Sequence, residues 1–221
     1  MFGEIAPRYD FLNRLLSFGI DRSWRKRTIH RLALPHGSAV LDLCCGTGDL
    51  AFAFSKSGAV VCGADFTLPM LSVAQRRKEN QERSIPWVQA DAQALPFTEE
   101  QFAAVSIAFG IRNVEDPEKA LRECHRVLQP GGKIAVLEFF PIPNPIWRGM
   151  FRFYFLHVLP LIAKVVRAGR TGAYRYLPES VDQFASSKKF ASWMEDAGFR
   201  VVCDQALTGG VARLLIGERI D

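Results

Sequence analysis

The sequence lacks the features of a secreted, disulfide-bonded or modular protein. Its five cysteines are an odd number without paired spacing, which is typical of a reducing compartment. No low-complexity linker or internal repeat divides the chain, and no basic and then apolar leader follows Met1, so a cytoplasmic protein is expected. The 221 residues, 48% of them hydrophobic, suffice for one well-buried core, and residues 1–221 are expected to form a single domain.

Acidic side chains are missing between Pro141 and Leu177, although the net charge of the whole chain is only +5. His157, Pro160 and Lys164 interrupt the apolar run in this stretch, so it does not supply the ~20 apolar residues of a membrane-spanning helix. Basic and aromatic side chains alternate there instead: Trp147, Arg148, Phe151, Arg152, Phe153, Tyr154, Phe155, Lys164, Arg167, Arg170 and Arg175.

Two interpretations of this stretch stay open. Basic residues mixed with aromatic ones suit anionic lipid headgroups, which makes residues 141–177 candidates for peripheral contact with the inner face of a membrane. The alternative is a substrate-side insertion, residues 141–187, that packs on the rest of the fold or forms a homodimer. Tyr174 and Tyr176 are candidates for gating a pocket between this insertion and the N-terminal segment.

The N-terminal segment has a helical pattern. Apolar residues recur at three- and four-residue steps from Phe2 to Phe18, which predicts an amphipathic helical lid over residues 1–34 with a break near Gly19. The basic run Trp24 to Arg27 is interpreted as a solvated helix face rather than as a phosphate or lipid contact.

Residues 40–50 have the pattern of a nucleotide cradle. Val40 to Leu43 predict a short strand, and Gly46 and Gly48 follow where the backbone must turn sharply and leave room for a ligand. A helix is expected to open at Asp49. A strand, a glycine turn and a helix N-terminus form such a cradle in an open α/β sheet, although the same glycines also fit a dinucleotide fold.

Three acids separate these alternatives. Asp42 precedes the glycine turn, where a carboxylate repels a pyrophosphate but suits the cationic methionine end of S-adenosylmethionine. Asp65 ends a second strand and is expected to accept bonds from ribose hydroxyls. Asp91 follows a third strand, where its side chain and the Ala92 N–H are predicted to bind adenine. The constellation favours a methyl donor over NAD.

The remaining pattern predicts an α/β fold with a mostly parallel, seven-stranded sheet. The apolar segment 102–109 is expected to be a central strand, and 133–140 a fifth strand. A surface helix is predicted over 68–83, a helix from Pro117 that is capped by Asp116, and another over 188–197. Segments 200–206 and 211–217 are expected to form a terminal hairpin.

The chain resembles the quinone-biosynthesis C-methyltransferases of the UbiE/MenG type. The resemblance lies in the motifs Tyr-Asp-x-x-Asn (9–13), Asp-Leu-Cys-Cys-Gly-Thr-Gly-Asp-Leu (42–50), Phe-Gly-Ile-Arg-Asn-Val (109–114), Pro-Gly-Gly (130–132), Leu-Glu-Phe (137–139) and Tyr-Leu-Pro-Glu-Ser (176–180), and it spans almost the whole chain. Three positions depart from the family pattern, namely Ala108 and Phe140, each in place of Ser, and Leu215 in place of His.

The resemblance implies a class I, Rossmann-like methyltransferase. Its expected reaction is transfer of a methyl group from S-adenosylmethionine to a ring carbon of a polyprenylated quinol, with demethylmenaquinol favoured over the benzoquinol of ubiquinone synthesis. The predicted donor site comprises Asp42, Gly46, Thr47, Gly48, Asp65, Phe66, Met70, Asp91 and Ala92. No metal is expected, since Cys44 and Cys45 have no His near them.

Methylation of an aromatic carbon requires electron density there, which an ionised ring hydroxyl provides. Arg112 is the candidate that stabilises this anion, Asn113 the candidate that orients the ring oxygens, and Tyr9 a further hydrogen-bonding candidate. The alternative for Arg112 is a surface salt bridge with Glu115 or Asp116.

Rival functions are a small-molecule N- or O-methyltransferase and a noncatalytic donor-binding protein. A nucleic-acid partner is not expected, because the loop after the fourth strand lacks the sequence of amino-methylating enzymes.

Overall fold

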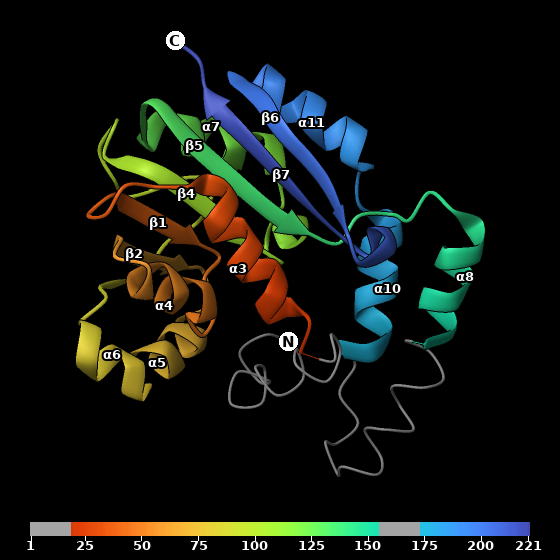
Figure 1. Ribbon diagram of the computed structural model, residues 1–221, viewed down its shortest axis with the longest axis horizontal. Helices are drawn as coiled ribbons and strands as arrows, with labels where there is room; N and C mark the ends of the chain where they lie inside the picture. Colours follow the sequence, from red (N-terminus) through yellow and green to blue (C-terminus); the bar gives the residue numbers. More distant parts are fainter. Residues whose placement is uncertain (1–18, 155–172) are drawn as a thin grey trace.

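In the computed structural model, which describes residues 19–154 and 173–221, seven strands form one sheet in the order β3-β2-β1-β4-β5-β7-β6 (Figure 1). The strands are β1 (Ala39–Leu43), β2 (Val60–Asp65), β3 (Trp87–Gln89), β4 (Phe102–Ala108), β5 (Leu128–Glu138), β6 (Phe199–Leu207) and β7 (Ala212–Arg219). The expected central position of the fourth strand is confirmed.

All strands of the sheet run parallel to one another except β7, the last strand in the chain. β1 pairs in parallel with β2 and β4, and β4 with β5, whereas β7 lies antiparallel between β5 and β6. The carboxyl ends of β1, β2, β3 and β4 therefore meet at one edge, which is where ligands bind in open α/β sheets. The short turn η4 (Thr208–Gly210) joins the strands of the predicted hairpin.

Helices cover both faces of the sheet. α3 (Asp21–Leu32) and α4 (Asp49–Lys56) pack on one face, and α7 (Pro117–Val127) and α11 (Ser187–Asp196) on the other; Figure 1 shows α3 in front of the sheet and α7 behind it. Side chains alternate between the two faces along a strand. Val40 therefore packs in the core beneath α3 and α4, whereas Leu41 and Leu43 pack in the core beneath α7 and α11. The asparagine-capped helix α8 (Pro145–Phe153) and α10 (Ala173–Gln183) follow β5 in the chain.

Two predicted elements have different bounds. The helix expected over 68–83 is two helices, α5 (Leu68–Arg76) and α6 (Lys78–Arg83), because Arg77 between them has an extended backbone with φ −65° and ψ 145°. The fifth strand begins at Leu128 and ends at Glu138, since Leu128 pairs with Phe102 before the register shifts to Lys133 opposite Ala104. The local sequence pattern does not reveal this pairing, because Phe102 and Leu128 lie far apart in the chain.

The predicted lid is described only from residue 19. Its helix α3 is part of a sheet-covering layer, with Trp24, Thr28 and Leu32 buried. The Trp24 indole donates to Thr208 Oγ1 at 3.0 Å and thereby ties α3 to the η4 turn. Lys26 and Arg27 are exposed, as a solvated face requires, but Trp24 faces the core and the Arg25 side chain, 12% exposed, is paired with Asp21.

None of the helices within the described ranges has the length and apolar character needed to cross a bilayer.

Candidate functional site

A cavity of about 340 Å³ lies at the carboxyl edge of the strands. Its walls come from the segments that follow β1, β2, β3 and β4, which the strand order brings together. The lining residues are Leu43, Cys44, Gly46, Asp65, Phe66, Thr67, Met70, Ala90, Asp91, Ala92, Gln93, Phe109, Gly110, Asn113, Val114 and Glu115. Six of the nine residues predicted for the donor site are among them; Asp42, Thr47 and Gly48 are not.

The turn after β1 leaves no room for a side chain at Gly48. Gly48 has φ +85°, and a Cβ there would stand 2.5 Å from the ring of Trp87. Gly110, on the opposite wall, approaches the turn so closely that a Cβ would stand 2.3 Å from Cys44 Cβ. Burial raises the pKa of the Cys44 thiol well above its ordinary value, so this cavity-lining sulfur is protonated and is no nucleophile.

Asp65, at the end of β2, accepts a hydrogen bond from the glycine turn. Its Oδ2 accepts from the Gly46 N–H at 2.8 Å, and its Oδ1 accepts from the Thr67 N–H at 2.8 Å. Burial raises the pKa of Asp65, and the two backbone donors oppose that rise. Each carboxylate oxygen keeps acceptor capacity, as the predicted contact with hydroxyl groups requires.

Asp91 and Ala92 form the wall beyond β3. The Gln93 N–H donates to Asp91 Oδ1 at 2.9 Å, so this carboxylate begins a tight turn as well as lining the cavity. Phe66 also lines the cavity, with 72% of its surface exposed. A large apolar ring left this exposed at a cavity wall is suited to cover a flat ligand.

Asp42 is buried beneath the cavity and does not line it. Its Oδ1 accepts from Ser106 Oγ at 2.7 Å, and its Oδ2 is buried without a hydrogen-bond partner among the described residues. Burial raises the pKa of Asp42 to about 7, while Ser106 and the charge of Arg25 act in the opposite direction. The predicted contact between Asp42 and a cationic ligand is therefore at most an electrostatic one across the turn.

Arg112 is tied to a residue that sequence spacing did not suggest. Its Nη1 donates to Oε1 of Glu138, at the end of β5, in an ion pair whose side chains are 7% and 0% exposed. The guanidinium also lies over the Phe139 ring, 5.6 Å from its centroid. The surface salt bridge with Glu115 or Asp116, considered as an alternative, is replaced by this buried pair. Burial raises the pKa of Glu138, and Arg112 counteracts the rise.

Asn113 lines the cavity, and its Oδ1 accepts from the Tyr176 hydroxyl at 2.6 Å. Tyr176 thus contacts a cavity-lining residue without itself lining the cavity, and its gating role stays a prediction. Arg112 Nε donates to Ser180 Oγ at 3.3 Å, one helical turn further along α10. Of the three candidates for the acceptor side, Tyr9 lies outside the described residues.

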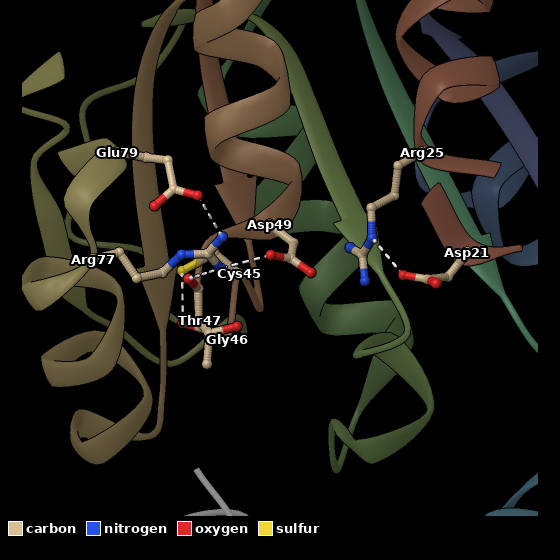
Figure 2. Close-up of polar contacts among 8 residues, drawn as sticks. All are labelled: Asp21, Arg25, Cys45, Gly46, Thr47, Asp49, Arg77 and Glu79. Carbon is tan, nitrogen blue, oxygen red and sulfur yellow. Dashed lines mark hydrogen bonds and ion pairs between the residues drawn. The ribbon is translucent and has the colours of Figure 1, made fainter. Parts of the chain in front are cut away.

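Arg77 holds the glycine turn from the opposite side of α4. Its Nη1 donates to the Thr47 carbonyl at 3.2 Å and to Asp49 Oδ1 at 2.6 Å, and its Nη2 donates to Glu79 Oε1 at 3.1 Å (Figure 2). The guanidinium also stacks over the Phe52 ring at 4.8 Å. The contact between Arg77 and Thr47 thus involves the Thr47 backbone. The sequence did not indicate a role for Arg77, because the hydrophobic periodicity of a charged surface helix does not show where that helix is interrupted.

Within the described ranges, no group of three or more His, Cys, Asp or Glu side chains is arranged to hold an ion. All five cysteines are free thiols, in agreement with the expectation drawn from their spacing.

Comparison with known proteins bears on this geometry. Residues 1–219 match the ubiE/COQ5 methyltransferase family. The chain belongs to this family. A demethylmenaquinone methyltransferase of Thermus thermophilus is 48% identical over 221 residues, which cover 99% of this chain and 100% of that protein. A ubiquinone/menaquinone biosynthesis C-methyltransferase of Syntrophotalea carbinolica is 45% identical, with 99% and 92% covered.

Solved structures share the fold at low identity. A SAM-dependent methyltransferase from Aquifex aeolicus has a TM-score of 0.66 and 18% identity, with 89% of each chain covered. The [4+2]-cyclase SpnF has a TM-score of 0.71 and 15% identity, with 90% of this chain and 80% of that chain covered. The predicted Rossmann-like fold, family and enzyme class are confirmed, and the cyclase illustrates that the fold alone does not fix the reaction.

Proposed function

We propose that this family member transfers a methyl group from S-adenosylmethionine to a ring carbon of a polyprenylated quinol, with demethylmenaquinol as its main substrate. The observation that carries the proposal is the cavity, which has carboxylates on the β2 and β3 side and a polar amide with a buried guanidinium behind it on the β4 side. The names of the relatives support a quinone ring as the acceptor.

The residues on the β2 and β3 side fit the donor. Asp65 offers carboxylate oxygens to ribose hydroxyls, Asp91 and the Ala92 N–H are suited to an adenine edge, and the exposed Phe66 ring is suited to cover the base. Gly46 and Gly110 keep the backbone walls close enough for contact. S-adenosylmethionine supplies an electrophilic methyl group on a sulfonium sulfur.

The residues on the β4 side fit an acceptor that must ionise. Phenolic pKa values lie near ~10 in water, so a protein that uses the phenolate at neutral pH has to stabilise it. Arg112 keeps a positive charge close behind Asn113, and Nη2 of the guanidinium has no hydrogen-bond partner among the described residues. In the net reaction the methyl group replaces a hydrogen on the quinol ring, that hydrogen leaves to solvent as a proton, and S-adenosylhomocysteine is the second product.

Contact with a membrane is the second part of the proposal. Helix α8 exposes four large apolar side chains, Ile146 (73%), Trp147 (47%), Met150 (57%) and Phe153 (60%). Arg148 and Arg152 lie on the same helix and are exposed as well. An amphipathic helix with exposed apolar and basic side chains suits an anionic bilayer, the medium in which a polyprenylated substrate dissolves.

A labelled-donor assay tests the reaction. The purified chain is mixed with methyl-labelled S-adenosylmethionine and short-chain naphtho- and benzoquinols that are kept reduced, and the products are separated. Label on a ring carbon of the naphthoquinol is expected. Label in the benzoquinol alone would reassign the substrate to ubiquinone synthesis, and label on oxygen or on added amines would favour an O- or N-methyltransferase. Donor binding without any transfer to quinols would overturn the proposal.

A further inference from the structure

Two side chains of α10 hold the loop that follows β4. Tyr176 donates its hydroxyl hydrogen bond to Asn113, and Ser180 accepts one from Arg112. Residues four apart in a helix lie on one face, one turn from each other, and here their partners are direct neighbours in the short helix η2 (Ile111–Asn113). We call these four residues the α10 clip.

The two ends of the clip differ in burial. At one end, Arg112 is fixed by its buried ion pair with Glu138. At the other end, Asn113 is an exposed residue that lines the cavity. Pro178 lies between the two ends, inside α10, and has no N–H to donate to the preceding turn. The Tyr176 turn is therefore held less firmly by the helix than the Ser180 turn.

A ring oxygen that approaches Asn113 comes within reach of the Tyr176 hydroxyl, because the two groups are 2.6 Å apart. A hydrogen bond to an ionised oxygen is roughly twice as strong as one between neutral groups. Moving the tyrosine O–H from the amide oxygen to a phenolate is thus favourable, whereas moving it to a neutral phenol gains little. The amide of Asn113 then keeps its own N–H donors for the same oxygen.

We propose that Tyr176 binds the ionised ring oxygen of the quinol by transferring its hydrogen bond from Asn113 to the substrate. The inference rests on the proposed function and adds to it a residue that recognises the ionisation state of the acceptor. No proton passes between the tyrosine and the substrate, since the quinol proton leaves to solvent.

The pH dependence of turnover tests this role in Tyr176→Phe. Turnover at saturating substrates reports the ionisation of the bound quinol. Loss of one donor to the anion raises the pKa of that quinol, so the acidic limb should move up by about one pH unit and turnover at pH 7 should fall about tenfold. Tyr154→Phe is the matched control, because it removes the same hydroxyl from a residue outside the α10 clip, and its acidic limb should coincide with that of the wild type.

Calorimetry supplies a readout besides activity. A reduced short-chain naphthoquinol is titrated into each protein in the presence of S-adenosylhomocysteine at pH 7 and pH 9. Tyr176→Phe should bind this quinol more weakly than wild type at pH 9, with affinity for S-adenosylhomocysteine unchanged. An unshifted acidic limb in Tyr176→Phe, or an equal shift in Tyr154→Phe, would overturn the inference. Failure of the wild type to methylate any quinol would instead overturn the proposed function.

Discussion

At the residue scale, the buried pair of Arg112 and Glu138 joins the residue proposed to stabilise the acceptor anion to the core of the fold. A carboxylate with no exposed surface is costly unless a cation compensates it. Sequence reasoning identified Arg112 from the loop in which it lies. It did not identify Glu138, because the two residues are 26 positions apart and meet only when β5 is aligned beside β4.

Arg112→Ala should therefore lower the free energy of unfolding by about 3–5 kcal/mol, since it leaves Glu138 buried without a partner. Adding Glu138→Gln should recover part of this loss, because the remaining group is then neutral. Denaturant unfolding of wild type, the single variant and the double variant measures both effects. A single variant within 1 kcal/mol of wild type, in the range of an exposed ion pair, would contradict the described burial.

Asp42 gives the stability of the protein a pH dependence. Its pKa is raised from 3.8 to about 7 on folding, so the native state holds this proton more tightly than the unfolded state does. Stability from this group is greatest at low pH and falls as the pH rises from about 4 to about 7. The charges of Arg25 and Asp65 act on Asp42 in opposite directions.

Comparison of wild type with Asp42→Asn isolates this effect, because all other groups are shared. Between pH 5 and pH 8, the free energy of unfolding of the wild type should fall by about 3 kcal/mol more than that of the variant. Parallel profiles in denaturant titrations at the two pH values would show that Asp42 is ionised throughout.

At the element scale, the break between α5 and α6 places Arg77 in contact with the glycine turn. Arg77 stands at this break and reaches the Thr47 carbonyl and Asp49, the residues that end the glycine turn and begin α4 (Figure 2). Arg83, at the end of α6, donates in a similar way to the Ser55 carbonyl at 3.2 Å, at the far end of α4.

The two arginines form a matched pair for mutation. Arg77→Gln should loosen the turn and raise the dissociation constant of S-adenosylmethionine roughly fivefold, in keeping with about 1 kcal/mol for a net hydrogen bond. Arg83→Gln should leave that constant unchanged, because its contact is remote from the cavity-lining residues. Calorimetric titration of S-adenosylmethionine into both variants measures these dissociation constants. An equal rise in the two variants would mean that Arg77 stabilises only the packing of α5 and α6.

The strands and the cradle could be predicted from the sequence because their signals are local. An apolar run followed by glycines defines β1 and its turn, and Asp116 with Pro117 defines the start of α7, where the Asp116 side chain accepts from the Lys119 N–H as a cap. The break at Arg77 and the early start of β5 depend on contacts between distant segments, which local patterns do not contain. The same limit applies to Asp42, whose place in the strand could be predicted but whose burial against Ser106 of β4 could not.

At the scale of the whole molecule, the cavity and the exposed face of α8 lie beyond the same end of the sheet. The clip connects α10 to the cavity wall, and Arg152 of α8 pairs with Asp182 of α10 at 2.9 Å. Figure 1 shows α10 and α8 next to each other beyond the tip of β5. A substrate taken from a bilayer at α8 would thus meet elements that also contact the site.

Cosedimentation with vesicles tests this arrangement. The wild type should pellet with vesicles that contain anionic lipid, and Ile146→Glu with Met150→Glu should largely abolish pelleting, because charge is placed on the apolar face of α8. Val202→Glu is the control, since Val202 is an exposed apolar residue, at 47%, on β6 instead. Wild-type protein that stays in the supernatant, or a control that loses binding equally, would remove the membrane from the proposal.

The four tryptophans lie in four different surroundings. Trp24 packs 6.0 Å from the cavity-lining Phe109, Trp87 lies under the glycine turn, Trp193 packs on Phe190, and Trp147 is the indole exposed on α8. Indole emission depends on local polarity, so each ring reports on one region without an added dye. In variants that each keep one tryptophan, a blue shift of Trp147 would register lipid contact, and quenching of Trp24 would register occupation of the acceptor side.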